Sequence, residues 1–440
     1  MQDQRQVAET IFKYALKAVE PAQLIKRAIR IDRHRLHCLD DIVELQDFNN
    51  IYVIGAGKAS APMAAAMEEI IAAKISRGAI TTKYGHATPL QYIVTTEAGH
   101  PVPDANGLKG TETIKSILES ATENDLVIIL LSGGGSALLA DIPLGCTLSD
   151  IQQCNELLLQ SGADIVEINT VRKHLSTVKG GQLTRIAYPA KMITLILSDV
   201  LGDPLDTIAS GPTVPDPTTF ADAWEVLEKY KLLNKVPDSV LIYLTEGKAG
   251  TYQETPKAGD RIFERVSNYI IGSNHLALAF AREKAEELGY TVEIYSEQLK
   301  GEAKEVAKTI VSYAKEAYKD KSKPKPYCIL AGGETTVTIL GNGLGGRNQE
   351  LALAAAIELE HQAGITLLSA GTDGTDGPTD ATGAVVDSTT LFQAIELGID
   401  GNVYLKNNNS YHFFRQVGGH LITGPTQTNV MDLIIVLIHT

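Results

Sequence analysis

The sequence predicts an α/β protein made of two α/β domains, the first built on a mainly parallel sheet. Its 440 residues exceed what one ordinary hydrophobic core holds, so two domains are expected. Short apolar runs alternate with segments of helical periodicity, which is the pattern of βαβ units. Hydrophobic periodicity disappears at residues 246–260, which indicates a loop and a domain boundary. The expected domains are therefore residues 1–245 and 260–440.

The first domain is expected to begin with one or two amphipathic helices, because apolar residues recur at helical spacing over residues 7–29. The capping residue of a later helix, at 146–162, is expected to be Thr147 or Ser149. The other expected elements are strands at 51–57, 91–100, 126–132 and 190–198, and helices at 58–74 and 107–121.

The second series begins after the loop. A short basic, proline-rich stretch at 321–326 is expected to be a linker, and the last strand is free to join either sheet. The expected strands are 268–274, 290–296, 327–340, 364–371 and 432–438, and the expected helices are 275–289, 301–321 and 347–360.

Composition and charge exclude several classes of function. The net charge of −14, without a long basic stretch, argues against nucleic acid as a partner. The apolar runs are far too short to span a membrane. Four cysteines without CxxC spacing and a polar start, "MQDQRQVAET", favour a cytoplasmic protein with reduced thiols. Because the chain as a whole is negatively charged, an anionic substrate must be attracted by a local cluster of Lys and Arg.

The stretch "LVIILLSGGGSALL" places three glycines between a strand and a run typical of a helix. Backbone N–H groups at such a turn are unpaired and attract anions. Because ligands bind at the carboxyl ends of strands in open α/β sheets, an anion site is favoured over a plain tight turn. The residues expected to hold it are Ser132, Gly133, Gly134, Gly135 and Ser136.

The stretch "IGAGKAS" nearly matches the dinucleotide-binding fingerprint, but Ser60 stands where the third Gly or Ala belongs. The next strand, "GAITTK", lacks the acidic residue that would bind a ribose. The Walker A spacing is also absent. Lys58 follows Gly57 at the start of a predicted helix, where a positive charge is unfavourable unless an anion binds beside it. Lys58 is therefore expected to be functional.

A third glycine-rich stretch, "GGETTVTILGNGLGGRNQE", predicts a ligand loop, with glycine pairs flanking a strand. Arg347 follows the last pair, and arginine matches the oxygens of phosphate or carboxylate groups. The alternative is a glycine-rich hairpin with a surface arginine. The candidate residues here are Gly332, Gly333, Glu334, Arg347 and Asn348.

Aspartates follow two predicted strands. "AGTDGTDGPTD" contains Asp373, Asp376 and Asp380, which indicate either a Mg²⁺ or hydroxyl site or simple Asx turns. Asp199 directly follows a strand, and is a candidate for holding Mg²⁺ or for accepting a hydroxyl proton.

The densest positive charge of the first half lies in "VRKHLSTVKGG". Arg172 or Lys179 is expected to bind the carboxylate of an acidic substrate. His100 and His174 are expected to be structural or solvated.

Together these stretches resemble the type II glycerate kinases, the glycerate 2-kinases, whose C-terminal part is the MOFRL domain. The resemblance extends from about Ile51 to near the C-terminus. The matching stretches are "VIGAGKAS", "GHPVPDANG", "LLSGGGSALL", "VRKHLSTVKGGQL", "LSDVLGDPLDTIASGPTVPDPTTF", "GGETTVTILGNGLGGRNQELALAAA" and "AGTDGTDGPTDATGAVVD".

The resemblance implies a Rossmann-like first domain with helices on both faces of its sheet. It implies a smaller second α/β sandwich containing the MOFRL region, at about residues 327–436, and an active site in the cleft between the domains. It further implies ATP, Mg²⁺ and phosphoryl transfer to D-glycerate, with 2-phosphoglycerate as the usual product. Lys58 and Arg347 are the residues that it implies act on the transferred phosphoryl group.

A homodimer is one possible form of the protein. The expected site residues fall into four groups. Catalysis is assigned to Lys58, Arg347 and Asp199, and the metal to Asp199 and Asp376. Substrate binding is assigned to Gly57, Arg172, Lys179 and Asn348. Cofactor binding is assigned to Ser132, Gly133, Gly134, Gly135, Ser136, Gly332, Gly333, Glu334 and Asp373.

Two other functions remain open at this point. One is an NAD(P)-dependent reductase of hydroxypyruvate or tartronate semialdehyde, suggested by the Gly55–Gly57 turn. The other is a sensor that binds a nucleotide or sugar acid without turnover, because a fold does not dictate a function.

Overall fold

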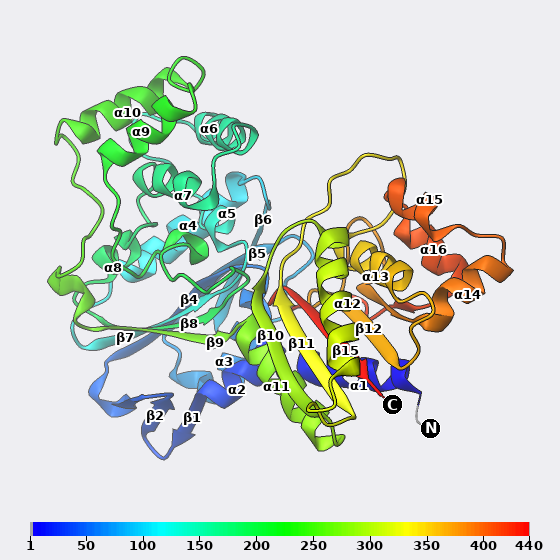
Figure 1. Cartoon of the computed structure of the whole chain (residues 1–440). Coiled ribbons are helices and arrows are strands. Elements are labelled where there is room, and N and C mark those ends of the chain that lie inside the picture. Colours follow the sequence, from blue (N-terminus) through cyan, green and yellow to red (C-terminus); the bar gives the residue numbers. More distant parts are fainter. Residues whose placement is uncertain (1–2, 440) are drawn as a thin grey trace. The chain divides into compact units, whose positions relative to one another are not determined.

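The computed structural model describes residues 3–439 and divides them into two compact units (Figure 1). One unit comprises residues 24–271. The other combines the described residues up to Gln23 with those from Gly272 onwards. Each unit contains a six-stranded sheet with helices, so the predicted two-domain α/β fold class is confirmed. None of the helices in residues 3–439 has the length and apolar character needed to cross a membrane.

The sheet of the 24–271 unit has the strand order β6-β5-β4-β7-β8-β9. All pairs from β6 to β8 are parallel. Because β4 and β7 lie side by side while the chain continues outward from each, the strand order reverses between them, and ligands of doubly wound folds bind at such a point. The strands are β4 (Asn50–Ala56), β5 (Arg77–Lys83), β6 (Ile93–Ala98), β7 (Asp125–Leu131), β8 (Lys191–Leu197) and β9 (Val266–Gly272).

Alternate residues of these strands, such as Ile54, Ile129 and Met192, pack in one core with α4, α5 and α8. A separate core joins the long helices α6, α7, α9 and α10. The helices are α2 (Pro21–Ala28), α3 (Ser60–Ile71), α4 (Ala105–Leu118), α5 (Gly135–Leu138), α6 (Leu148–Gln160), α7 (Ile165–His174), α8 (Gln182–Ala187), α9 (Phe220–Lys229) and α10 (Asp238–Lys248). A small antiparallel sheet contains β1 (Ile29–Asp32), β2 (Arg35–Cys38) and β3 (Asp41–Glu44).

The second sheet is mixed, with the order β10-β11-β15-β12-β13-β14. Only the β10–β11 pair is parallel among the pairs of this sheet that the structure describes. Its strands are β10 (Thr291–Leu299), β11 (Tyr327–Gly333), β12 (Ile365–Gly371), β13 (Gly383–Asp387), β14 (His420–Leu421) and β15 (Asp432–Ile438). The helices of this unit are α1 (Gln4–Ala18), α11 (Asn274–Glu287), α12 (Ala303–Lys319), α13 (Arg347–Glu358), α14 (Ser388–Glu396), α15 (Gly401–Lys406) and α16 (Ser410–Val417).

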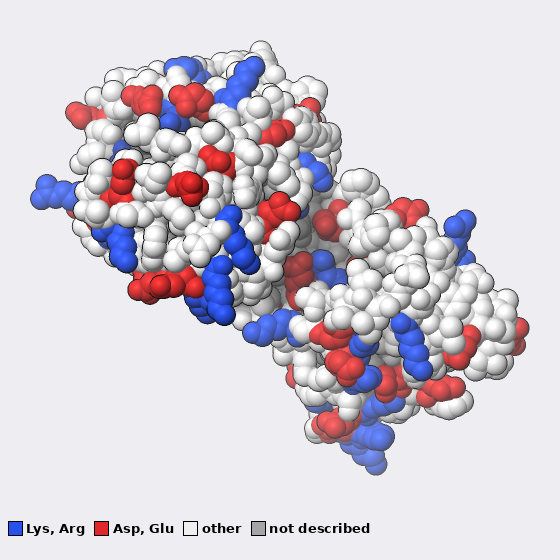
Figure 2. Space-filling model, turned by 90° about the horizontal axis from the view of Figure 1, so that it is seen from above, with Lys and Arg blue, Asp and Glu red and all other residues white. Residues whose placement is uncertain are grey.

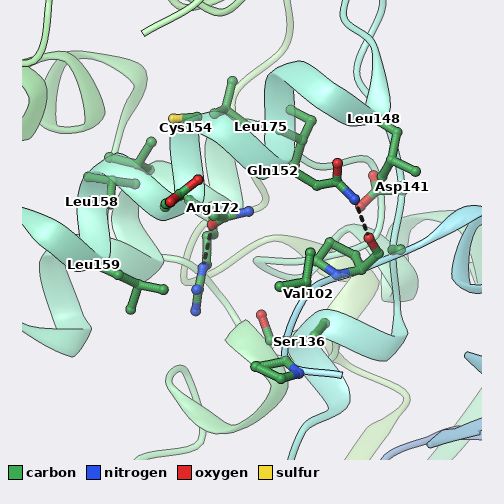
Figure 3. A pocket seen from close by; sticks show the side chains of 18 of the residues that line it. Val102, Ser136, Asp141, Leu148, Gln152, Cys154, Leu158, Leu159, Arg172 and Leu175 are labelled. Carbon is green, nitrogen blue, oxygen red and sulfur yellow. Dashed lines mark hydrogen bonds between the residues drawn. The ribbon is translucent and has the colours of Figure 1, made fainter. Parts of the chain in front are cut away.

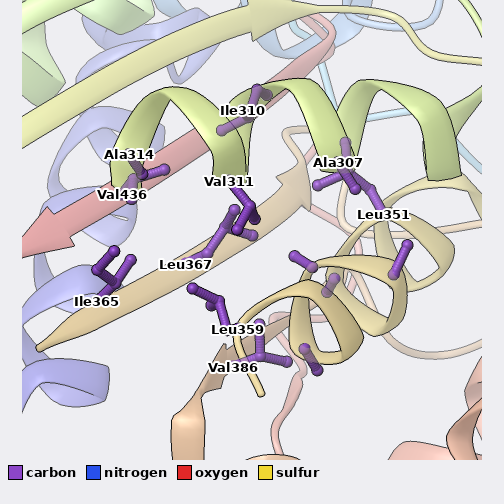
Figure 4. Close-up of a cluster of buried hydrophobic side chains, with 14 of the residues drawn as sticks. Ala307, Ile310, Val311, Ala314, Leu351, Leu359, Ile365, Leu367, Val386 and Val436 are labelled. Atoms are coloured by element: carbon purple, nitrogen blue, oxygen red, sulfur yellow. The ribbon is translucent and has the colours of Figure 1, made fainter. Parts of the chain in front are cut away.

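The core of this unit lies between the sheet and the α12–α13 pair. Figure 4 shows Ile310 and Val311 of α12 and Leu351 of α13 facing Leu367 of β12 and Val436 of β15. Because successive side chains of a strand point to opposite faces, the alternate residues of the same strands are left for α1 and α11. The unit is therefore a three-layer sandwich.

Charged side chains are interspersed by sign on the face that Figure 2 presents. A continuous basic band is absent from the residues in that view. This distribution agrees with the net charge of −14.

Two boundaries differ from the expected ones. The first helix, α1, belongs to the unit of residues 272 onwards, where Arg5 donates to both carboxylate oxygens of Asp387 at 2.7 and 2.8 Å. Strand β9, expected to open the second domain, instead forms the edge of the first sheet beside β8. The basic stretch at 321–326 connects α12 to β11 within one unit. Periodicity identifies a helix or strand, but it does not say which sheet that element joins.

We expect Phe12→Ala to destabilise the unit that contains α1. The Phe12 side chain is fully buried, and removing it leaves a cavity that costs about 3–5 kcal/mol. Lys13→Ala, one residue along on the exposed side of α1, should change the free energy of unfolding by about 0.5 kcal/mol or less. Urea unfolding of the full chain measures both. Equal effects of the two substitutions would contradict the packing of α1 described here.

Candidate active site

Two glycine-rich turns meet where β4 and β7 end. A Cβ atom on Gly57 would lie 2.1 Å from the Ser132 Oγ. The Lys58 N–H donates to the Gly133 carbonyl oxygen at 2.9 Å, and the Ala59 N–H donates to the Ser132 Oγ at 3.0 Å. Glycine is therefore required at position 57 so that the turns can approach this closely, and Lys58 is fixed against the second turn.

Side chains of the protein itself occupy the space beside the glycines of the second turn, so a residue with a Cβ atom does not fit there. A Cβ atom on Gly133 would lie 1.9 Å from the Asp199 Oδ2. Gly134 has a φ of +82°, and a Cβ atom there would lie 2.8 Å from the His100 Cδ2 and 3.4 Å from the Lys58 Cγ. Because these glycines lack a Cβ atom, the side chains of Asp199, His100 and Lys58 can all pack against this one turn.

The N–H groups of Gly133 and Gly134 make no hydrogen bond with any other part of residues 3–439. Two adjacent unpaired donors at the end of a strand are suited to an anion. The helix that follows, α5, is only four residues long, although the sequence indicated a longer one. The anion site expected here therefore depends on these two N–H groups rather than on a helix dipole.

Two titratable side chains at this turn have shifted pKa values. Burial raises the pKa of Asp199, and the charge of Lys58 opposes that shift. Burial, with Lys58 acting in the same direction, lowers the pKa of His100 to about 4, so its imidazole is neutral at pH 7. His100 was expected to be structural or solvated, and instead it faces the candidate site. The signal that points to it is its position two residues after β6, at the same edge of the sheet.

The loop after β8 also contacts the second turn. The Ser136 and Ser210 hydroxyl oxygens lie 2.8 Å apart, and the Ser210 hydroxyl donates to the Asn169 Oδ1 at 3.0 Å. Ala209 and Ser210 have φ values of 51° and 59°, a left-handed conformation that costs energy for residues with a side chain. Ser210 therefore positions the Ser136 hydroxyl, and the sequence analysis did not identify it.

A cavity of about 600 Å³ adjoins this turn within the same unit (Figure 3). Gly134, Ser136 and His100 form one end of it. Helix α6 supplies more of the lining residues than any other element, and α7 adds Val171 and Arg172. Apolar side chains outnumber polar ones among these residues.

Arg172 and Lys179, both expected to bind an anion, line this cavity but differ in their partners. The Lys179 Nζ donates to the Leu139 carbonyl at 2.7 Å and lies 3.1 Å from Asp141 Oδ1, so its charge is paired. The Arg172 Nε donates to the Asn155 Oδ1 at 2.8 Å, and no carboxylate within residues 3–439 lies within 4.0 Å of its guanidinium. Burial lowers the pKa of Arg172. Arg172 is therefore the cation available to a ligand.

The neighbouring Lys173 is structural. Its side chain is buried, and its Nζ lies 3.3 Å from Asp216 Oδ1 and 3.5 Å from Asp206 Oδ2. His174 is buried as well, with its ring nitrogens near the Thr170 carbonyl and Glu254. The positive charge seen in this stretch of sequence is thus partly neutralised in the core.

In the other unit, Arg347 begins α13 and is held by two carboxylates. Its Nε and Nη2 donate to the two oxygens of Asp432 at 2.6 and 2.9 Å, and its Nη1 lies 3.1 Å from Glu334 Oε1. Although burial opposes the charge, the hydrogen bonds with Asp432 raise the pKa of Arg347 above its ordinary value. A guanidinium has five N–H donors, so two remain for a ligand.

Asp376, expected to bind a metal, contacts the start of the same helix. Its two oxygens accept from the Asn348 N–H at 3.0 Å and the Gln349 N–H at 2.8 Å. Gly346, which precedes the helix, has no side chain to do so. Burial raises the pKa of Asp376. Within residues 3–439, no three His, Cys, Asp or Glu side chains gather as a metal site would require, so the metal role of Asp376 stays a prediction.

Packing accounts for the glycines at the end of β11. A Cβ atom on Gly332 would lie 1.9 Å from the Asn274 Oδ1, and one on Gly333 would lie 2.2 Å from the Leu299 carbonyl oxygen. Asp373 accepts the Thr375 N–H at 3.2 Å, as in an Asx turn. The cofactor-binding roles expected of Gly332, Gly333, Glu334 and Asp373 stay predictions.

The strand expected between the two glycine groups is instead a loop, over residues 334–346. Three consecutive asparagines hold it. The Asn408 Oδ1 accepts the N–H groups of residues 340 and 341 at 2.8 and 3.0 Å, and the Asn407 and Asn409 side chains accept those of residues 342 and 344, each at 3.1 Å. This loop leads into Arg347.

Comparisons with known proteins assign the family. A profile described as "Domain of unknown function (DUF4147)" matches residues 7–245, and the "MOFRL family" profile matches residues 327–432. A D-glycerate 2-kinase of Thermotoga maritima is 45% identical over 99% of this chain and 98% of its own. A glycerate 2-kinase of Pyrococcus horikoshii is 42% identical, with the same coverage. The chain belongs to the MOFRL family of glycerate kinases.

The fold agrees with this assignment. The crystal structure of a Thermotoga maritima glycerate kinase matches with a TM-score of 0.89 and 44% identity, and covers 99% of each chain. A protein of known structure from Pyrococcus horikoshii matches with a TM-score of 0.90 and 41% identity, over 100% of this chain and 99% of its own. The resemblance predicted from the sequence is confirmed.

Another relative, from Agrobacterium vitis, has the name "Putative hydroxypyruvate reductase" and is 40% identical over 99% of this chain and 94% of its own. The end of β5 does not favour a nicotinamide dinucleotide in this kinase family member. It carries Thr82 and Lys83, and the Thr82 hydroxyl donates to the Gly57 carbonyl at 3.2 Å. An acidic side chain would be needed there for the ribose.

We expect Gly57→Ala to disrupt the junction of the two turns. Its Cβ would overlap Ser132, so the free energy of unfolding should fall by about 3 kcal/mol or more. Gly85→Ala is the matched control, because Gly85 also has a positive φ, +77°, but has no atom within 4 Å of a new Cβ. That substitution should cost only about 1 kcal/mol. If urea unfolding gave equal losses, the close approach at Gly57 would be incorrect.

Proposed function

We propose that this chain transfers the γ-phosphoryl group of ATP to D-glycerate, giving 2-phosphoglycerate and ADP. The observation that carries the proposal is the full-length similarity to glycerate 2-kinases, at 42–45% identity. The local geometry supports it, because Lys58 and two unpaired N–H groups lie together where a doubly wound sheet binds its ligands.

Phosphoryl transfer requires positioning and positive charge more than covalent chemistry. The glycerate hydroxyl attacks the γ-phosphorus, and the bond from phosphorus to the β–γ bridging oxygen breaks, so that ADP leaves with the electron pair and the hydroxyl proton passes to water. The N–H groups of Gly133 and Gly134 bind phosphate oxygens. Lys58 and the two remaining donors of Arg347 stabilise the negative charge on the transferred group.

Mg²⁺ is suited to Asp199. Mg²⁺ in phosphoryl-transfer sites is usually held by one or two carboxylates together with substrate phosphates and water, so one carboxylate beside the unpaired N–H groups is a sufficient protein contribution. When bound, the ion neutralises charge on the donor phosphates. We assign Asp199 to the metal rather than to the hydroxyl proton, because loose phosphoryl transfer makes little demand on a base.

The acceptor is proposed to contact the backbone of Gly57 rather than the space beside it, because Ser132 fills the position that a Cβ atom would take there. Asn348 orients Asp432 by donating to its Oδ1 at 2.9 Å. Of the two cations expected to bind the carboxylate, Lys179 is already paired with Asp141, whereas Arg172 is not.

Phosphorus NMR of the purified protein with ATP, Mg²⁺ and D-glycerate tests the function directly. We expect a new phosphomonoester signal that matches 2-phosphoglycerate. A 3-phosphoglycerate signal would contradict the assigned product, and the absence of transfer would contradict the kinase. Oxidation of NADH by hydroxypyruvate would then favour the reductase.

We expect Lys58→Met and Arg347→Met each to lower kcat by about 10³-fold or more, because each removes a charge from the transferred phosphoryl group. Arg347→Met also leaves the buried Asp432 without its partner, so stability must be separated from catalysis. The double variant Arg347→Met/Asp432→Asn removes both charges and is the control. Recovery of turnover in the double variant would show that Arg347 acts only on stability.

We expect Asp199→Asn to lower kcat by about 10²-fold or more and to stabilise the protein at pH 7. Because the folded state raises the pKa of Asp199, the unfolded state binds fewer protons, and stability falls as pH rises through the carboxyl range. The amide removes this loss. Thermal unfolding at pH 4 and pH 7 should show the larger gain at pH 7, and an equal gain at both would contradict the shift.

A further inference from the structure

The cavity beside the second turn is too large for the proposed acceptor. Glycerate has three carbons and four oxygens, which need roughly 200 Å³ if each occupies as much space as a water molecule. The cavity holds about 600 Å³. Ligand cavities normally enclose most of the surface of the ligand, so a larger molecule is expected here.

The walls of the cavity are suited to an aromatic base. More than half of the lining residues are apolar, and the carboxylates among them are Asp141 and Glu156. The apolar residues include Leu148, Ile151 and Leu158 of α6, Val171 of α7, Leu175 just after α7, and Val102. Glycerate, with a carboxylate and two hydroxyls, would leave these side chains without apolar contacts. A flat heteroaromatic ring would bury them.

Two amide side chains provide polar contacts within these walls (Figure 3). The Gln152 Nε2 donates to the Pro103 carbonyl at 2.7 Å, and the Asn155 Oδ1 accepts from Arg172. The other polar atoms of these amides, Gln152 Oε1 and Asn155 Nδ2, make no hydrogen bond with any other part of residues 3–439. One acceptor and one donor therefore remain for the polar edge of a base.

The charge of Arg172 and the N–H groups of the second glycine turn indicate how a ligand is oriented in the cavity. Figure 3 shows the Arg172 guanidinium within the cavity, on the side of Ser136. It is a cation without a carboxylate within 4.0 Å in the described chain, and it lines the same cavity as the apolar side chains and Gly134. A ligand with an apolar ring at one end and several negative charges along its length matches this arrangement.

We propose that the cavity binds the nucleoside part of the nucleoside triphosphate donor, with the base against α6 and α7, an α- or β-phosphate on Arg172, and the terminal phosphates at the Gly133–Gly134 turn. This inference rests on the proposed kinase function, because it locates that reaction's donor. It also assigns Arg172 to the donor rather than to the carboxylate of glycerate.

Two variants test the assignment by steady-state kinetics. Leu148→Trp fills the cavity from a half-buried position, and Arg172→Met removes the charge with little change in length. We expect each to raise the KM for ATP by about tenfold or more while the KM for glycerate stays within about twofold. Ile242→Trp adds the same bulk on the exposed side of α10, outside the cavity, and should change neither. Thermal unfolding verifies that each variant is folded.

A raised KM for glycerate with an unchanged KM for ATP would overturn the proposal and place the acceptor in the cavity. Unchanged values for both substrates in folded variants would also overturn it. Arg172→Lys should recover part of the affinity for ATP, because lysine restores the positive charge although it lacks the planar fork of arginine.

Direct binding separates this inference from the proposed function. Titration calorimetry with a non-hydrolysable ATP analogue and Mg²⁺, without glycerate, should give binding to the wild type that Leu148→Trp weakens. If the analogue binds in this way but NMR shows no transfer to glycerate, the kinase proposal fails and the nucleoside site stands. If transfer occurs while Leu148→Trp binds the analogue normally, the kinase stands and the nucleoside site fails.

Discussion

The close approach of two backbone turns is the constraint on which the site in residues 24–271 depends. The turns after β4 and β7 are joined by hydrogen bonds from Lys58 and Ala59, and glycine at 57 makes this possible. The same lack of Cβ atoms at Gly133 and Gly134 admits Asp199 and His100. The N–H groups of Gly133 and Gly134 have no partner within residues 3–439. The turn that packs against the end of β4 is therefore also the candidate anion site.

The cations of the two units are held in different ways. Arg347 is fixed by Asp432 and Glu334 on a helix whose start Asp376 binds, so its orientation is set before any ligand arrives. Arg172 has only a neutral amide as its partner. In a chain with a net charge of −14, an unpaired guanidinium in an apolar cavity is costly, and an anionic ligand would offset that cost.

Most elements could be predicted from the sequence, because strands and helices differ in hydrophobic period and glycines mark sharp turns. The roles of the candidate residues stay predictions. His100 and Ser210 were missed because each has its role only through contact with a residue distant in the sequence. The expected strand after Gly333 is a loop because Asn407, Asn408 and Asn409 satisfy its N–H groups in place of a neighbouring strand.

Local patterns of residue type and spacing are enough to predict the α/β class, the family resemblance, and where Lys58, Arg347 and the glycine turns lie in the chain. The tertiary contacts are needed to learn that α1 packs on the second sheet and that β9 joins the first. They are also needed to learn that Lys179 is paired with a carboxylate and Asp376 with N–H groups, whereas Arg172 has only a neutral amide as its partner. The hydrogen-bond and ion-pair partners of a side chain, and its burial, depend on contacts between residues that are distant in the chain. Hydrophobic periodicity is a local property and does not predict such contacts.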